Sequence, residues 1–242
     1  MTKFAFVASV MLDVRLVSFA DSWFIACIKN TDCCAGDFCN ITLLQIGELT
    51  GNGKQSQLIG GYEIFTNAVA EMVVGEGAEV DHYRLLLESE TAYHIGSNRV
   101  HISQDGSFNS RSFQKGTGFG RYDLYVLLNG PEAYCELNGL YMTSGSQHMD
   151  NFINIDHAKP HTTSRLYYKG ILDGKSRAVF GGTVWVRKDA QKTDAIQSDK
   201  NLLLSPEAEV DTKPALFIYA DDVKCGHGAT AGNIDEDTVF YM

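Results

Sequence analysis

The sequence lacks any apolar run of the roughly 20 residues that a membrane-spanning helix requires. Proline is scarce, with 4 residues among 242, and no Lys/Arg cluster offsets the formal net charge of −10. Without such a run we expect no membrane span. Because the negative charge would repel a phosphate backbone, we expect no nucleic-acid partner. Long Ala/Leu/Glu/Lys stretches are also missing, which favours strands over helices.

The cysteines are distributed unevenly: four lie within thirteen residues, while Cys135 and Cys225 are isolated. A small domain held together by disulfides would scatter its cysteines in pairs, so a reducing, cytoplasmic compartment fits better, with a plastid as the eukaryotic alternative. The apolar start faintly resembles a signal peptide. However, Asp13 and Arg15 follow it directly and no small-residue cleavage site comes next, so we do not expect secretion.

Three segments differ in pattern. Residues 1–41 are mixed, rich in Cys and Asp, and stay unassigned. Residues 42–232 carry short β-prone runs without intervening amphipathic helices, and we interpret them as one β-rich core domain. Residues 233–242 read as a helix start with Asp235 as the N-cap, and they stop within about two turns. The expected strands are 41–46, 71–74, 99–103, 122–128, 134–142, 152–155, 164–172, 178–186 and 215–220.

A loose repeat is visible in the turns before these strands. Each turn has a polar start, then a small residue, then alternating side chains, as in 75–80, 130–135, 187–192 and 205–210, with a weaker copy at 105–108. The repeated positions are 78, 107, 133, 190 and 208. Most of the intervals between them are near one or two times a period in the high twenties, and the last interval is short. Such a period indicates a β-solenoid whose turns stack on one another, with a β-sandwich as the alternative.

Two motifs imitate functional sites. The segment 170–176 is similar to a phosphate-binding loop, but it is one residue short and strand formers follow it where a helix should begin. We interpret it as a tight Asp-Gly turn, and the chain as no ATPase. The N-terminal cysteines do not form the two close pairs of a structural zinc site, so we interpret them as incidental: Cys27, Cys33, Cys34 and Cys39.

Three histidines lie close together in sequence, at His148, His157 and His161, with carboxylates nearby. Such a density could serve a metal or an acid–base site. The same residues also serve as turn formers and as hydrogen-bonded ladders between the turns of a solenoid, and we favour this structural role.

Cys225 and His227 are two residues apart, so on a strand both side chains point to one face. A thiolate and an imidazole suit iron and zinc. Lys224 would lower the pKa of the thiol if it approached in space. Two ligands cannot close a tetrahedral site, so the remaining ligands must come from elsewhere or from a partner chain. The alternative is a buried Cys beside a surface His.

Several longer motifs, read together and in order, resemble the core of the SufB/SufD family of iron–sulfur cluster assembly proteins. They are 137–141, 157–164, 168–177, 191–195, 201–204, 210–214 and 221–230. The last of these, Asp221–Thr230, resembles the SufD branch of the family. The match runs from about residue 65 to the end and is strongest from about residue 120.

The resemblance implies a right-handed parallel β-helix and a role as a scaffold, not an enzyme, in the SUF system. It implies pairing with SufB, with each of the two subunits docking a copy of the ATPase SufC. Residues matching Cys225 and His227 would face a SufB cysteine at the subunit junction. A nascent iron–sulfur cluster would be held there transiently and shared with the partner, or none would be held by this chain alone.

The chain departs from the family at both ends. Residues 1–50 match nothing recognised, and the helices that follow the position of Phe240 and Tyr241 in the family, where SufC docks, are absent. Docking of SufC is therefore doubtful. A degenerate, truncated protein that pairs with SufB or with itself is the alternative. A carbohydrate-cleaving β-helix is less suitable, because adjacent Asp221 and Asp222 would point to opposite faces of a strand.

Overall fold

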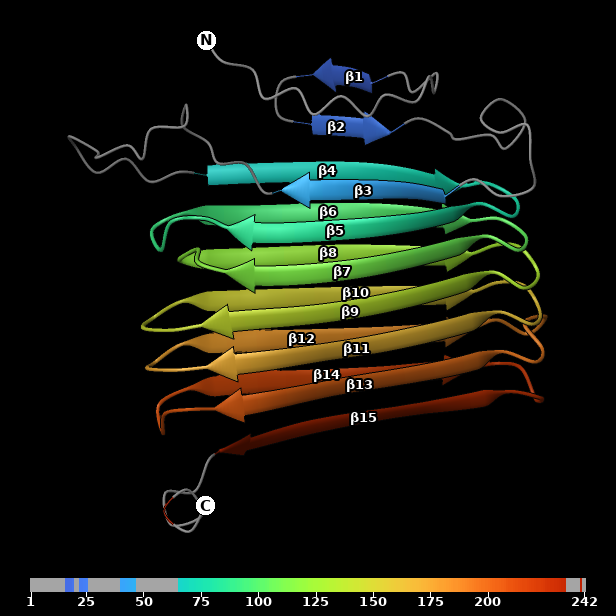
Figure 1. Cartoon of the computed structure of the whole chain (residues 1–242). Helices are drawn as coiled ribbons and strands as arrows, with labels where there is room; N and C mark the ends of the chain where they lie inside the picture. Colours follow the sequence, from blue (N-terminus) through green and yellow to red (C-terminus); the bar gives the residue numbers. More distant parts are fainter. Residues whose placement is uncertain (1–15, 20–21, 26–39, 47–64, 234–239, 241–242) are drawn as a thin grey trace.

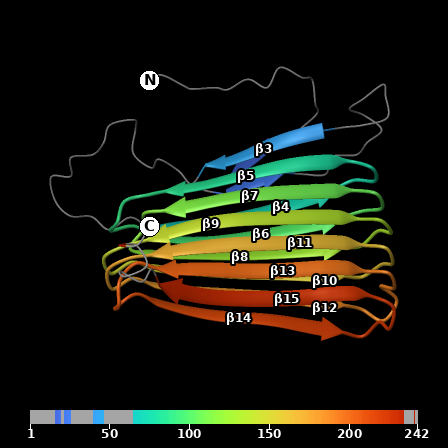
Figure 2. The ribbon, with the colours of Figure 1, turned by 60° about the horizontal axis from the view of Figure 1, so that its bottom comes forward.

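The computed structural model describes residues 16–19, 22–25, 40–46, 65–233 and 240. Two parallel sheets face each other, and the chain alternates between them from β3 and β4 to β15 (Figure 1). The strands of each sheet stack along the molecule. Figure 2 shows the strands of one sheet lying over those of the other. We call these the even sheet and the odd sheet, after the strand numbers. A separate antiparallel pair, β1 (Leu16–Phe19) and β2 (Ser22–Ile25), lies within the segment left unassigned.

The strands of both sheets are mostly ten residues long. The even sheet contains β4 (Phe65–Val74), β6 (Tyr93–Ile102), β8 (Phe119–Leu128), β10 (His148–His157), β12 (Arg177–Val186) and β14 (Glu209–Ile218). The odd sheet contains β3 (Asn40–Ile46), β5 (Glu79–Leu87), β7 (Ser107–Lys115), β9 (Tyr134–Thr143), β11 (Thr163–Leu172), β13 (Asp194–Leu203) and β15 (Lys224–Asn233).

The register confirms the predicted solenoid. Along one inward column of the odd sheet, positions 80, 108, 135, 164, 195 and 225 pair in succession, and their spacing agrees with the period predicted from the sequence. Parallel pairing throughout both sheets rules out the β-sandwich alternative, whose strands are antiparallel. The domain limits 42–232 stay a prediction, although β3 begins at Asn40 and β15 ends at Asn233. Most of the expected helix start at 233–242 lies outside the described residues.

The repeated turns are present, with one difference in placement. In the four full copies the amide of the small residue donates to the carbonyl three positions earlier, as Ala78 does to Gly75 and Ala133 to Gly130. In the weaker copy this bond is made by Gly106 and not by Ser107. The turn containing Ala208 connects β13 to β14, on the opposite side of the solenoid from the others. That placement explains why the final interval of the sequence repeat is short.

The sequence pattern does not predict the four odd-sheet strands β5, β7, β13 and β15. In the first three of these, the inward positions carry buried polar side chains, so the apolar alternation typical of a strand is missing. The buried polar residues include His82, Arg84, Ser110, Ser112, Gln197, Asp199 and Asn201. The solenoid interior is therefore partly polar, and its hydrogen bonds run between successive turns.

Large and small inward residues alternate between adjacent turns. Tyr141 donates a hydrogen bond of 2.5 Å to the side-chain oxygen of Asn201, two turns further on. Gly170 lies between them, because its strand pairs with both of theirs. A Cβ atom at Gly170 would lie closer than 3.0 Å to both side chains. The contact between Tyr141 and Asn201 therefore depends on the missing side chain at position 170.

We predict that Gly170→Ala destabilises the fold by about 1–3 kcal/mol, the usual cost of overpacking a filled core. Urea unfolding followed by circular dichroism measures this change. Gly232→Ala is the matched control, since a Cβ there meets nothing within 4 Å and its cost should stay within about 0.5 kcal/mol. Equal stability of the two variants would contradict the packing described for Tyr141.

Two inward histidines are held neutral by burial. His82 contacts the Ser110 hydroxyl at 2.9 Å, and burial, aided by the nearby charge of Arg84, lowers the pKa of His82 to about 4. His157 contacts the hydroxyls of Thr162 and Ser164 at 2.7 and 2.9 Å, and burial lowers its pKa to about 4 as well. The His82 ring therefore links successive solenoid turns without a charge, and the His157 ring links β10 to the start of β11 within one solenoid turn.

We predict that these two histidines make the fold less stable in mild acid. Below pH 6.5 the unfolded chain binds protons at both positions, whereas the folded chain stays unprotonated there until about pH 4. Each ring should therefore cost up to about 3 kcal/mol across that interval. Urea unfolding at pH 7, 6 and 5 measures the loss, and proton NMR should show neither ring titrating above pH 5.5. A stability that rises on acidification across this range would refute the assignment.

Candidate functional site

Strand β15 carries Cys225 and His227 on its inward face. Cys225 pairs with Ala195 and His227 pairs with Gln197, and both partners in β13 are buried inward residues. The prediction that the two side chains share one face is therefore confirmed. Among the described strands, β15 pairs with β13 alone, so this inward face lies at the end of the stack (Figure 1). His227 is exposed there and Cys225 is half-buried.

The Cys225 thiol is partly enclosed by the core. It packs against the hydrophobic cluster, and burial raises its pKa, with a smaller opposing effect from the backbone of Ala195. The charge of Asp194 raises the pKa further. The expected lowering by Lys224 does not occur, because as the next residue on a strand it points to the opposite face. Binding of a metal at this thiol must therefore release a proton.

The turn before β15 is hydrogen-bonded to the equivalent turn before β13. The Lys192 amide donates to the carbonyl of Asp222 at 2.6 Å, and the amide of Asp222 donates to the side chain of Gln191 at 3.0 Å. Lys192 and Asp222 also form an ion pair. Asp221 and Asp222 lie in this turn and not on a strand, which corrects the expectation that they occupy opposite strand faces. These contacts fix where β15 begins, directly before Cys225.

The end of the stack exposes apolar side chains. We call β14 and β15 the terminal strands. Phe217 and Tyr219, at the end of β14 and just after it, stack with Trp185 on the outer face of the even sheet, with ring centroids 4.2 and 6.5 Å from that of Trp185. Ile218 is 42% exposed although it belongs to an inward column. The end of β14 therefore exposes apolar side chains on both its outer and its inward side.

Two polar side chains that the sequence analysis did not single out lie one turn behind the site. Gln197 is buried, and its amide nitrogen donates to the Gly182 carbonyl at 3.2 Å. Asp199 accepts a hydrogen bond of 2.7 Å from Asn201, and burial raises the pKa of Asp199. The sequence offers no alternation that would find them, because residues 197–201 are all polar. Their inward direction follows only from the pairing of β13.

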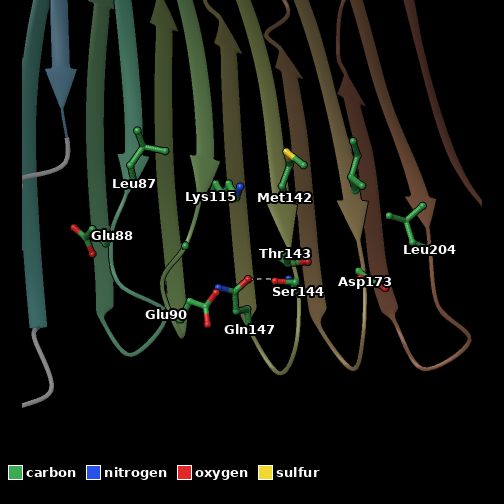
Figure 3. A pocket seen from close by; sticks show the side chains of 12 residues that line it. Leu87, Glu88, Glu90, Lys115, Met142, Thr143, Ser144, Gln147, Asp173 and Leu204 are labelled. Atoms are coloured by element: carbon green, nitrogen blue, oxygen red, sulfur yellow. Dashed lines mark hydrogen bonds between the residues drawn. The ribbon is translucent and has the colours of Figure 1, made fainter. Parts of the chain in front are cut away.

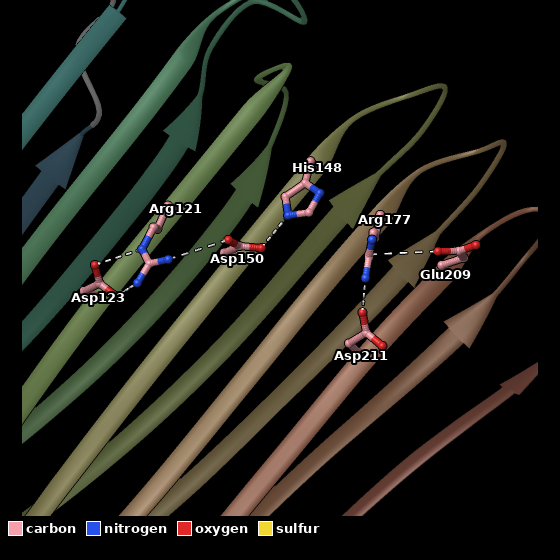
Figure 4. A network of polar contacts seen from close by, with 7 residues as sticks. All are labelled: Arg121, Asp123, His148, Asp150, Arg177, Glu209 and Asp211. Atoms are coloured by element: carbon pink, nitrogen blue, oxygen red, sulfur yellow. Dashed lines mark hydrogen bonds and ion pairs between the residues drawn. The ribbon is translucent and has the colours of Figure 1, made fainter.

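The three clustered histidines do not converge. His148 lies on the outer face of the even sheet, 2.6 Å from the Asp150 carboxylate, within an ion-pair network of Arg and Asp side chains (Figure 4). His157 lies inside the solenoid, and His161 lies in an exposed turn, 3.5 Å from Glu132. These placements fit the structural role favoured for them.

The other segments considered as possible sites in the sequence take no part in this pair. Segment 170–176 forms the end of β11 and the turn into β12, as expected, and Lys175 pairs with Glu207. Cys27, Cys33, Cys34 and Cys39 lie outside the described residues. A hollow follows the turns at the ends of the odd strands, with Leu87, Glu90, Met142 and Leu204 among its lining (Figure 3). Neither Cys225 nor His227 lines it.

No group of three or more His, Cys, Asp or Glu side chains converges within the part of the chain that the structure describes. In that described part, the pair on β15 is therefore joined by no third His, Cys, Asp or Glu side chain to make up such a group. In the same described part, no helix has the length and apolarity needed to cross a membrane.

The sequence of the chain is similar to that of a known protein family. Residues 49–242 match the SufBD core domain of SUF-system FeS cluster assembly. The chain is 38% identical over 178 residues to the iron–sulfur cluster assembly protein SufD of Escherichia coli, covering 74% of this chain and 42% of that protein.

A chloroplastic protein of Arabidopsis thaliana, ABCI7, is 38% identical over 181 residues, covering 74% of this chain and 38% of the relative. A SufBD family protein of Synechocystis is 34% identical over 178 residues, covering 74% and 39%. The chain thus spans about two fifths of the length of these relatives. With its parallel solenoid and its match over residues 49–242, the chain belongs to the SufB/SufD family and is SufD-like within it.

Proposed function

We propose that this chain is a scaffold subunit of the SUF iron–sulfur cluster assembly complex, and that Cys225 and His227 hold part of the nascent cluster. The observation that carries the proposal is the position of both side chains on one inward face at the end of the stack. The E. coli relative, named as an iron–sulfur cluster assembly protein, supports it.

The chemistry of the pair suits the cargo. A thiolate sulfur and an imidazole nitrogen are ligands that iron accepts. The cluster is what the complex builds, so it is held transiently, and this chain contributes binding and orientation rather than catalysis. Because two ligands leave an iron site open, the remaining ones come from a partner that covers the terminal strands.

The partner we propose is SufB, seated on the apolar end formed by Phe217, Ile218 and Tyr219. Burial of these side chains by a second subunit would remove apolar surface from water and bring foreign ligands next to Cys225. The ATPase SufC would act on the same complex. Bacterial and chloroplastic relatives support a cytoplasmic or plastid location.

We predict that the double substitution Cys225→Ala and His227→Ala abolishes cluster formation in the complex that the natural protein forms, while far-UV circular dichroism stays unchanged. His227 is exposed, and Cys225 packs only partly buried against the end of the core, so the fold should survive the loss of both side chains. Iron and sulfide content and visible absorbance of the purified complex measure the result.

Cys135→Ala is the control for that experiment. Cys135 occupies the same inward column three turns earlier, where it is fully buried and burial raises its pKa well above the usual range. Its loss should leave cluster formation intact. Undiminished assembly in the double variant would overturn the proposed site.

A second function is favoured by the same apolar end: a degenerate protein that pairs with SufB, or with a second copy of itself, but no longer supports assembly. Phe217→Ser together with Tyr219→Ser should weaken capture of SufB at least tenfold in a pull-down assay, because large apolar groups dominate such contacts. Capture of SufB without SufC, and without iron in the complex, would favour the degenerate protein. Capture of both, with iron, would favour the scaffold.

A further inference from the structure

Gln197 lies directly behind His227 on the inward face of the odd sheet. The two residues pair in the register of β13 and β15, and paired residues of parallel strands lie about 4.8 Å apart. Gln197 is 1% exposed. Its side-chain oxygen is buried and has no hydrogen-bond partner among the described residues. A buried amide oxygen without a donor is costly, by roughly 1–3 kcal/mol, so this oxygen calls for a donor that the described contacts do not supply.

The orientation of the amide is fixed by the opposite sheet. Its nitrogen donates to the carbonyl of Gly182 in β12, at 3.2 Å. A carbonyl can only accept, so the nitrogen and not the oxygen must face Gly182. The amide reaches this carbonyl because Gly182 has no side chain: a Cβ there would overlap the amide nitrogen. The oxygen is therefore held pointing away from Gly182.

Among the residues in register with Gln197 and with Gly182, one side chain can donate to this oxygen. Leu166, one turn back in the same column, is apolar, and Pro214, which pairs with Gly182, has no N–H. The Thr212 hydroxyl lies close to the Asp199 carboxyl, two residues further along β13, and opposes the rise in the pKa of that carboxyl. On the terminal side, the residue in register with Gln197 is His227, whose ring carries an N–H in every protonation state.

We infer that the Gln197 side-chain oxygen accepts a hydrogen bond from one ring N–H of His227 and so leaves the other ring nitrogen free to bind iron. His227 is exposed, so its side chain is able to rotate toward Gln197, its partner in the register. Gln197 is then a positioning residue: it selects the tautomer and orientation of the imidazole, as partners behind metal-binding histidines do. The role in iron binding rests on the proposed function, whereas the hydrogen bond itself does not.

The test measures the tautomer directly. In the full chain labelled with ¹⁵N-histidine, the ring nitrogen shifts of His227 at neutral pH should show one tautomer favoured over the ratio of free histidine. Gln197→Met, which keeps the side-chain length without an acceptor, should return His227 to the free ratio. A free ratio in the unsubstituted chain, or no change in the variant, would overturn the inference. The first of these measurements holds even if the variant does not fold.

Gln114→Met is the matched control. Gln114 is also an inward glutamine that is 1% exposed, and its side-chain oxygen is likewise buried without a partner among the described residues, while its nitrogen donates to Ser112 and Asn151 in an earlier part of the solenoid. Its substitution removes a buried amide with a comparable structural cost, and it should leave the His227 shifts unchanged. If it moved them as Gln197→Met does, the effect would be one of general stability and the inference would fail.

A second readout connects the hydrogen bond to cluster assembly. In the complex with the partner, Gln197→Met should slow cluster formation about tenfold or more, the usual effect of removing a group that orients a metal ligand. Normal assembly in this variant, together with loss of assembly in the Cys225/His227 double variant, would overturn the positioning role alone. Normal assembly in the double variant would overturn the proposed function and leave the tautomer result standing.

Discussion

The stacking of inward side chains in register is the constraint on which this molecule depends. Each inward residue meets the residue one turn before it, the residue one turn after it, and residues of the facing sheet. Volume must therefore balance locally and not only in total. Tyr141 and Asn201 can meet because position 170 between them is glycine, and the amide of Gln197 crosses to the other sheet because position 182 is glycine. The same registration brings Cys225 and His227 to one face.

Polar groups are accepted inside the solenoid because the stacking also supplies their partners. Arg84 is buried with its guanidinium 4.0 Å from the centre of the Tyr122 ring and one nitrogen 3.3 Å from the Ser112 hydroxyl. His157 bonds to two hydroxyls across a turn. Such contacts contribute less to stability than apolar packing of equal volume, but they specify which turn lies on which.

Much of the fold could be predicted from the sequence, and the polar interior explains the rest. The repeated turns and the apolar runs of β8, β9, β11 and β12 were sufficient to indicate a solenoid. Strands β5, β7 and β13 were not predicted because most of their inward positions carry polar residues. The side chains still alternate in direction along these strands, but hydrophobicity does not alternate with them. The turn at Ala208 fell on the unexpected side because local sequence does not say which sheet a turn enters.

The candidate site, too, could be predicted from the sequence only in part. That Cys225 and His227 share a face follows from strand geometry alone, which is a local property. The direction of the Cys225 pKa shift is not local: it depends on burial against the core, and the neighbouring Lys224 has no part in it. Gln197 and His227 are a full solenoid turn apart in sequence, and only the pairing of β13 with β15 brings them together.

The position of β15 also has a consequence for motion. In a stacked array each turn is held by its neighbours, and within the described chain β15 has hydrogen-bonded contact with one strand where interior strands have two. Opening free energies in such arrays are smallest at the ends. The two proposed ligands therefore lie on a strand that opens at a lower energy than the interior strands of the described solenoid. In the free chain, local opening of β15 would expose both side chains while the interior turns stay folded.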